Sequence, residues 1–138
     1  MLSTNNQMLM QETSIRYLGV YIDYNISWKT HITNISKKIK RSIGILSKLR
    51  YFLSIKTLLS LYHALVELFL NYCLIAWGNT YQTTLQPLFI LLKKALRIIS
   101  FSSYYEHSSP LFKDLNVVKL SDIITLQLAV FMYKFHHV

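Results

Sequence analysis

Residues 28–48 read WKTHITNISKKIKRSIGILSK, and this stretch decides the fold. Its apolar side chains recur every three or four residues, a spacing that predicts an amphipathic α-helix of about five turns. The apolar stripe consists of Trp28, Ile32, Ile35, Ile39, Ile43 and Leu46. Ser27, directly before this stretch, is a favoured N-cap residue, so we expect the helix to begin there.

The same helix carries a second stripe, which is basic. It consists of Lys37, Arg41, Gly44 and Lys48, with Lys40 beside them. Gly44 costs about 1 kcal/mol relative to alanine inside a helix, so it either allows the close approach of another backbone or is simply tolerated. One face of the helix is therefore expected to pack on a core, and another to present positive charge.

The charge around this helix has one sign. No acidic residue lies between Asp23 and Glu67. Eight of the fifteen Lys and Arg residues fall in that interval, namely Lys29, Lys37, Lys38, Lys40, Arg41, Lys48, Arg50 and Lys56. A solvated helix face usually mixes signs for i,i+4 pairing, whereas an unopposed basic face is typical of contact with phosphates or lipid headgroups. A solvated surface on a basic protein is the alternative.

The segment before this helix is expected to be β-structure. Residues 1–24 include a plausible turn at Asn5-Asn6 and an apolar and aromatic run over residues 15–22, which is typical of a strand. Gly19 inside that run indicates a bulge or a close backbone approach.

Three further helices are expected. They run from Ser54 to about Trp77 with a stop at Gly78, from about Leu85 to Ser100 with Pro87 in the first turn, and from Asp122 to Phe135 with Ser121 as N-cap; residues 110–115 add a single turn. The predicted fold class is mainly α, a bundle of about four helices with a short N-terminal β hairpin. We divide it into a hairpin over residues 1–26 and a helical region over residues 27–138.

Composition limits the class of protein. The length of 138 residues corresponds to one domain. Apolar residues make up 52%, and mean hydropathy is +0.29, so the chain is expected to collapse rather than stay disordered. A single cysteine excludes a disulfide scaffold and a cysteine zinc cluster. The formal charge of +9 favours a polyanion or an anionic membrane surface as partner.

Residues 58–77 are apolar enough to raise the question of a membrane span. Their polar exceptions, Ser60, His63, Glu67 and Asn71, fall on one helical stripe. A span would place Glu67 near the middle of the bilayer at a cost of roughly 2.5–3.5 kcal/mol, so we favour a nearly buried helix with one wet edge. The first eleven residues are polar and lack the basic region of a signal peptide.

A search for catalytic chemistry finds none. The aspartates Asp23, Asp114 and Asp122 are far apart in sequence, and no Gly-rich phosphate loop is present. Among the histidines only the pair His136-His137 has neighbouring ligands, and zinc needs four. Cys73 lies in the most apolar predicted helix, where a buried inert thiol is expected. We therefore predict neither a catalytic nor a metal site.

Two further groups of side chains are candidates for contact. Lys93, Lys94 and Arg97 form a second basic patch, spaced for one helix face. Trp28, Tyr62, Tyr72 and Trp77 fall on core-like stripes and are assigned to packing. Tyr17, Tyr21 and Tyr24 share a strand face without a burial signal, which leaves contact with a ligand open.

An ordered series of short matches resembles reverse transcriptases of non-LTR (LINE-type, jockey-like) retrotransposons, in the segment after the polymerase palm. The series begins with IRYLGVYID at residues 15–23, followed by Ile26-Ser27-Trp28 and His31-Ile32. It continues with Tyr72-Cys73, Trp77-Gly78, KKALRII at residues 93–99, His107, PLFKDL at residues 110–115, Leu120 and Asp122-Ile123. The resemblance covers about Asn5 to Phe135; Leu92 departs from it, since glutamine is common there.

The resemblance implies that this chain and the catalytic palm have different roles in the polymerase. Leu18 and Gly19 would lie in the primer-grip hairpin at the edge of the palm, and the helices after it would be the thumb and the region that follows. The catalytic aspartates and their Mg²⁺ would belong to the palm, which together with the endonuclease domain lies upstream of these residues. The chain alone is therefore expected to be inactive, with no cofactor of its own, and it looks like a truncated element copy that acts in nucleus and cytoplasm.

The expected function is sequence-nonspecific binding of a template–primer duplex, such as an RNA–DNA hybrid, by a fragment of an RNA-directed DNA polymerase. A thumb contacts phosphates rather than base edges, and the predicted contacts are Lys37, Lys40, Arg41, Lys48, Lys93, Lys94 and Arg97. The missing palm would be its protein partner. The alternatives are a helical protein-interaction or scaffold module without nucleic-acid binding and, with less support, a membrane-associated helical protein.

Overall fold

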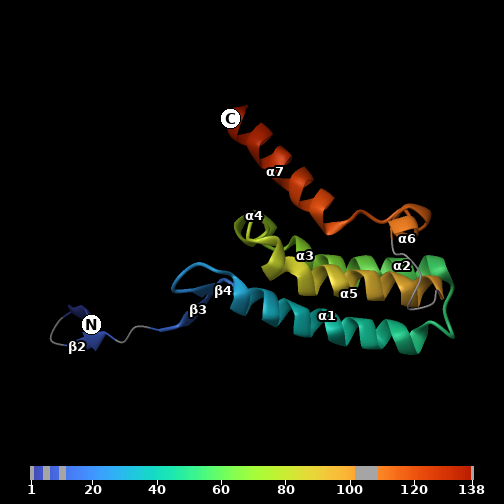
Figure 1. Cartoon of the computed structure of the whole chain (residues 1–138), viewed down its shortest axis with the longest axis horizontal. Helices are drawn as coiled ribbons and strands as arrows, with labels where there is room; N and C mark the ends of the chain where they lie inside the picture. The colour runs from blue at the N-terminus through green and yellow to red at the C-terminus, as the bar shows by residue number, and fades with distance from the viewer. Residues whose placement is uncertain (1, 5–6, 10–11, 102–108, 138) are drawn as a thin grey trace.

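A computed structural model of the chain describes residues 2–4, 7–9, 12–101 and 109–137 (Figure 1). Its strands are β1 (Leu2–Thr4), β2 (Gln7–Leu9), β3 (Ser14–Tyr17) and β4 (Val20–Asp23). Its helices are α1 (Lys29–Leu49), α2 (Ile55–Tyr62), the π-helix η1 (His63–Glu67), α3 (Leu68–Asn71), α4 (Leu74–Trp77), α5 (Gln82–Ser100), α6 (Ser109–Asp114) and α7 (Leu120–His136). The predicted class, mainly α with N-terminal β-structure, is confirmed.

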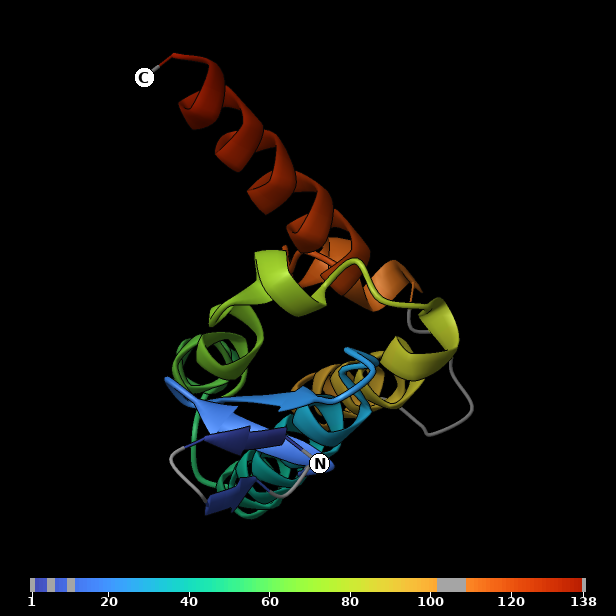
Figure 2. The same ribbon diagram turned by 90° about the vertical axis from the view of Figure 1, so that its left-hand side faces the viewer.

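The core lies between α1, α5 and the helical segment that begins with α2, which run side by side in Figure 1 and are viewed end-on in Figure 2. The predicted apolar stripe of α1 supplies one wall, because its members from Ile32 to Leu46 are all buried. α5 supplies a second wall through Leu85, Leu88, Leu92, Ala95, Leu96 and Ile99. Tyr62 and Trp77, both assigned to packing from the sequence, are buried as well.

The N-terminal β-structure consists of two separate antiparallel hairpins rather than one, β1 with β2 and β3 with β4. The predicted turn at Asn5-Asn6 lies outside the described residues. Gly19 forms a two-residue turn with Leu18 rather than a bulge, and what approaches it closely is the Tyr72 side chain, 3.5 Å from a Cβ placed on Gly19. Both turn residues have positive φ, 50° and 82°, the combination that suits the twist of a tight hairpin. The Tyr72 hydroxyl donates to the Leu18 carbonyl, so this turn is fastened to the helical body.

The start of α1 differs from the prediction, because Ser27 does not cap it. The residue before the helix is Trp28, which has a left-handed backbone (φ 64°) and no side-chain cap. The Asp23 carboxylate takes the place of a side-chain cap. Its Oδ1 accepts from Thr30 Oγ1 (2.5 Å), and its Oδ2 accepts from Ser27 Oγ (2.8 Å). Ser27 thus supports the acid that holds the first turn, and strand β4 and helix α1 are joined through Asp23.

The predicted single helix over residues 54–77 is interrupted. Ser54 caps α2 as expected, accepting from the Thr57 N–H. The backbone hydrogen-bond pattern then changes from that of an α-helix to that of a π-helix at residues 63–67. In this segment the Leu65 carbonyl accepts a hydrogen bond from Ser42 Oγ of α1 (2.9 Å). Insertion of a neighbouring side chain at a helix carbonyl is one physical cause of such a bulge. The helix breaks at Tyr72, whose backbone is extended, and Cys73, whose φ is +54°.

This break corrects two side-chain predictions. Cys73 is exposed rather than buried, and Tyr72 is exposed rather than part of the core. Both lie where the chain turns out of the helix axis, which removes them from the core-facing stripe that a continuous helix would have given them. Gly78 follows α4 as the predicted stop; a Cβ there would lie 2.6 Å from the Leu74 carbonyl oxygen.

The C-terminal part follows the predicted order with small shifts. α5 begins at Gln82, so Pro87 lies inside the helix rather than in its first turn. α7 begins at Leu120, because this buried residue packs into the core as the first residue of the helix; Lys119, not Ser121, is the N-cap. α7 then leaves the helical body and points away from it (Figures 1 and 2). In the described part of the chain, no helix combines the length and apolar character that a bilayer crossing requires.

Candidate nucleic-acid interface

A groove runs between α1 and α5, which lie alongside each other in the same direction (Figure 1). It consists of two cavities. The first, of about 530 Å³, lies between residues 29–40 of α1 and residues 83–87 of α5. The second, of about 340 Å³, lies between residues 40–47 of α1 and residues 91–98 of α5. Lys40 lines both, so the two cavities are parts of one surface.

The groove is lined by basic and small polar side chains together with apolar ones, which are Ile32, Ile43, Pro87, Leu91 and Ile98. Its cations are Lys29, Lys37, Lys40 and Lys94, and its hydroxyl groups belong to Thr33, Ser36, Ser47, Thr83 and Thr84. Ser36 is 7% exposed, and its hydroxyl has no hydrogen-bond partner. Pro87 lacks the N–H that would donate to the Thr83 carbonyl. Ammonium and hydroxyl groups of this kind are the usual donors to phosphate oxygens.

The charged residues that line the two cavities are all basic. Within the described residues, the ion pair that forms joins His63 to Glu67 (2.9 Å), and neither residue lines the groove. Neither of the two cavities is lined by an acidic residue. Gly44 lies in the second cavity, and no atom would lie within 4 Å of a Cβ placed on it. Its role is therefore not to admit a neighbouring helix backbone.

The structure brings together only part of the predicted basic set. Lys37, Lys40 and Lys94 line the groove. Arg41 and Lys48 are exposed on the adjacent stripe of α1 and line neither cavity. Arg97 is half-buried near the end of α5, and Lys29 is a groove residue that the site prediction missed. Lys29 could have been found from its spacing to Thr33, Ser36 and Lys40 on one helical stripe.

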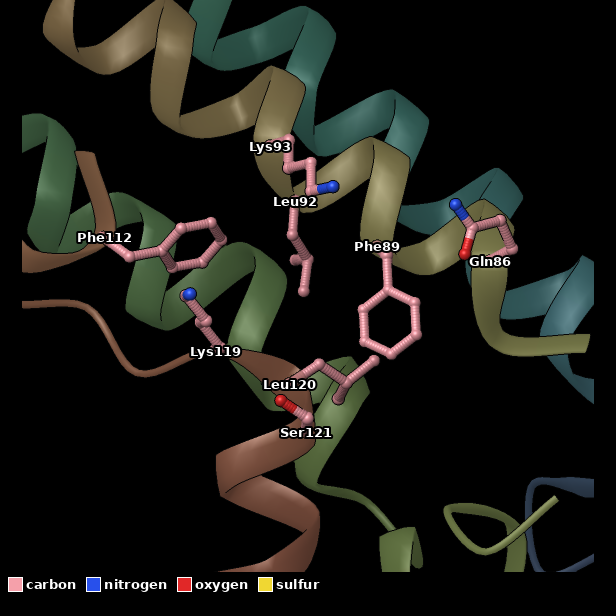
Figure 3. Close-up of a pocket in the computed structure, with 8 residues that line it drawn as sticks. All are labelled: Gln86, Phe89, Leu92, Lys93, Phe112, Lys119, Leu120 and Ser121. Atoms are coloured by element: carbon pink, nitrogen blue, oxygen red, sulfur yellow. The ribbon is translucent and has the colours of Figure 1, made fainter. Parts of the chain in front are cut away.

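Lys93 does not share a face with Lys94, which corrects the predicted second patch. It lines a separate cavity of about 210 Å³ between α5, α6 and the start of α7 (Figure 3). Phe89, Phe112 and Leu120 give that cavity an apolar wall, and Lys119 lies with its ammonium 5.8 Å from the centre of the Phe112 ring. Adjacent residues on a helix point about 100° apart, so the Lys-Lys pair is divided between two surfaces.

Leu18 and Gly19, the residues that the resemblance places in a primer grip, lie at the tip of the β3–β4 hairpin. Gly19 borders a cavity of about 310 Å³ between this hairpin, α1 and α3, together with Arg16, His31, Lys38 and Tyr72. Lys38 therefore faces this cavity and not the groove. The hairpin and the groove are separate surfaces on either side of the first half of α1.

Two buried titratable groups hold the hairpin against α1. Burial alone would raise the pKa of the Asp23 carboxyl, but the hydrogen bonds from Thr30 and Ser27 outweigh it and hold that pKa below its usual value. Burial, with Lys38 nearby, lowers the pKa of His31 to about 4. Because His31 Nδ1 accepts from the Tyr21 N–H (3.3 Å), its neutral form carries the proton on Nε2, which has no partner.

The described residues contain no group of three histidine, cysteine, aspartate or glutamate side chains placed to hold a metal ion. Basic and hydroxyl side chains along two parallel helices can bind an extended polyanion through its charge.

Sequence comparison gives the class of protein: the chain is similar to part of the RNA-directed DNA polymerases of mobile elements. The particular relatives are two proteins named RNA-directed DNA polymerase from mobile element jockey, from Drosophila melanogaster and Drosophila funebris. Each is 29% identical over 87% of this chain, and the chain spans 13% of the length of each. The resemblance to jockey-like reverse transcriptases is confirmed. No family model and no solved structure matches the chain.

Proposed function

We propose that the chain is a thumb-like segment of a non-LTR retrotransposon reverse transcriptase and that it holds the template–primer duplex in the groove between α1 and α5. The observation that carries the proposal is the charge of that groove, where four lysines from two parallel helices line the two cavities and no acidic residue lines either of them. In this proposal polymerisation and its Mg²⁺ belong to a palm domain, which is the protein partner of the segment, in nucleus and cytoplasm.

The expected contacts are to phosphates, because lysine ammonium groups and serine or threonine hydroxyls carry no base-reading geometry. Affinity should therefore depend weakly on base sequence and strongly on salt. Four phosphate contacts predict a slope of log affinity against log salt of roughly −3 to −4. Arg41 and Lys48 extend the contact along the outer stripe of α1, and Leu18 and Gly19 present the hairpin tip as the primer-grip counterpart.

The test is fluorescence anisotropy of the purified chain with an RNA–DNA hybrid, titrated across salt. We expect Lys37→Glu with Lys40→Glu to weaken binding at least tenfold and to reduce the salt slope by about 2. Lys56→Glu with Lys113→Glu is the matched control, because both lysines are exposed and lie outside the groove. Equal weakening by both double variants would assign binding to overall charge and would overturn the groove as the contact surface.

A second candidate function is a protein-interaction module. The exposed apolar side chains of α7, among them Leu126, Phe131 and Phe135, favour it. This function predicts a folded chain, verified by circular dichroism, without salt-sensitive affinity for any duplex. The same titration therefore separates the two candidates.

A further inference from the structure

An aromatic and cationic cluster lies at the C-terminal ends of α1 and α5. The Arg50 guanidinium lies 4.3 Å from the centre of the Phe101 ring and 5.5 Å from that of Tyr51. The two rings meet edge to face, with centres 6.4 Å apart. Arg50 directly follows α1 and Phe101 directly follows α5, so the cluster joins the two helices that form the groove.

Packing does not account for this cluster. Tyr51 is 76% exposed and Phe101 is 48% exposed, so both rings keep much of their surface in water. Within the described part of the chain, Arg50 has no carboxylate partner, and its Nε is buried without an acceptor. The guanidinium is instead held by the rings, which fixes all three side chains in a defined arrangement without covering them.

The position of the cluster continues the groove. Along α1 the first cavity lies at residues 29–40, the second at residues 40–47 and the cluster at residues 50–51. Along α5 the same order holds, with the cavities at residues 83–87 and 91–98 and the cluster at residue 101. The 21 residues of α1 span about 32 Å at 1.5 Å per residue. At about 3.4 Å per nucleotide, a strand that follows the groove reaches the cluster after roughly nine nucleotides.

We propose that Arg50, Tyr51 and Phe101 form a stacking platform for unpaired bases where a nucleic-acid strand leaves the groove. Aromatic rings and guanidinium planes stack on every base, so they bind single strands without reading sequence. A duplex that ends at the platform leaves it empty, whereas a single-stranded extension fills it. This inference rests on the proposed function, because the groove brings the strand to the platform.

The experiment compares a blunt RNA–DNA hybrid of about nine to twelve base pairs with hybrids that carry a short 5′ or 3′ overhang containing 2-aminopurine. We expect one overhang polarity to raise affinity about tenfold and to quench 2-aminopurine fluorescence on binding, as stacking requires. Tyr51→Leu should lose both effects and keep the affinity for the blunt hybrid. Tyr51→Phe, which keeps the ring, should retain both. Phe101→Leu should behave as Tyr51→Leu does.

Tyr133→Ala is the matched control, because Tyr133 is an exposed aromatic residue on α7, away from the groove. If the wild-type chain binds the blunt hybrid with the expected salt dependence but neither overhang adds affinity or quenching, the platform is overturned and the groove stands. If Tyr51→Leu keeps both effects, the platform is overturned as well. If no hybrid binds at low salt, the proposed function itself fails.

Discussion

His31 shows how one side chain ties the stability of this molecule to pH. It is 2% exposed, lies 5.5 Å from the Trp77 ring centre, and has a folded-state pKa of about 4. The unfolded chain takes up a proton near pH 6.5. Below that pH the unfolded state binds more protons than the folded state, so stability falls as pH decreases from about 6.5 to about 4 and levels off below.

We therefore expect the free energy of unfolding to drop by up to about 3 kcal/mol across that window. His31→Gln removes the titrating group while retaining an acceptor for the Tyr21 N–H. Urea unfolding at pH 7 and pH 5 checks the prediction, and the variant should show a clearly smaller difference between the two pH values. An unchanged pH dependence in the variant would assign the effect to other groups.

Asp23 and Ser27 show what sequence reasoning can and cannot find at the residue scale. Ser27 has the residue type and position of an N-cap. No local sequence signal indicates that Asp23, four residues earlier, takes this role instead. Asp23 takes the role because the β3–β4 hairpin folds back and brings its carboxylate to the Thr30 N–H and hydroxyl. The capping residue was therefore decided by a tertiary contact rather than by the sequence pattern around the helix start.

At the scale of elements, periodicity predicted the long helices and missed the break in the helix over residues 54–77. Residues 72–77 are apolar and would continue the helix. They include no glycine or proline that would signal an interruption before Gly78. Two contacts hold the break: Tyr72 donates to Leu18 in the distant hairpin, and the Tyr72 carbonyl accepts from Nε1 of Trp77, five residues later (2.9 Å). A contact between a helix and a hairpin 54 residues away leaves no periodic pattern in the sequence.

The break predicts the chemistry of the single cysteine. Cys73 lies exposed in the left-handed region, so its thiol should react with Ellman's reagent in the folded protein nearly as fast as in the unfolded one. A buried thiol, which the apolar helix suggested, would react only on unfolding. The measurement is the rate of thiol modification with and without denaturant, and protection of a hundredfold or more would contradict the exposed position.

Gly44 gives the second prediction at this scale. It lies inside α1, its backbone is helical, and no atom lies within 4 Å of a Cβ placed there. Gly44→Ala should therefore stabilise the chain by about 0.5–1 kcal/mol through helix propensity, as measured by urea unfolding. Ser47→Ala on the same stripe is a control with a smaller expected gain. A loss of stability in Gly44→Ala would contradict the open space beside this position.

At the scale of the whole molecule, the basic stripe of α1 was readable from sequence and the groove was not. Spacing alone identified Lys37 and Lys40, because both lie on a helix whose apolar face was clear. The second wall depends on which face of α5 meets α1. Burial of Leu88, Leu92 and Ile99 turns α5 so that Lys94 enters the groove and Lys93 faces α6 and α7. Only the packed body distinguishes these adjacent lysines.

α7 carries the prediction that belongs to this scale. Leu126 and Phe131 are exposed and, with Ile75 and Val130, line an apolar cavity of about 320 Å³ beside α4. An exposed apolar surface of this kind binds hydrophobic dyes and promotes association. Leu126→Gln with Phe131→Gln should therefore lower ANS fluorescence and self-association in sedimentation. The free energy of unfolding should change by no more than about 0.5 kcal/mol per site, because both side chains are already exposed.

The same variant separates the two surfaces of the molecule. Neither substitution changes charge, and neither residue lines the groove, so the affinity for an RNA–DNA hybrid and its salt slope should stay as in the unmodified chain. A parallel loss of duplex binding would mean that α7 and the groove act as one surface. Retained binding with reduced association would make α7 a separate contact surface, whose apolar side chains serve protein packing while the lysines of α1 and α5 serve the nucleic acid.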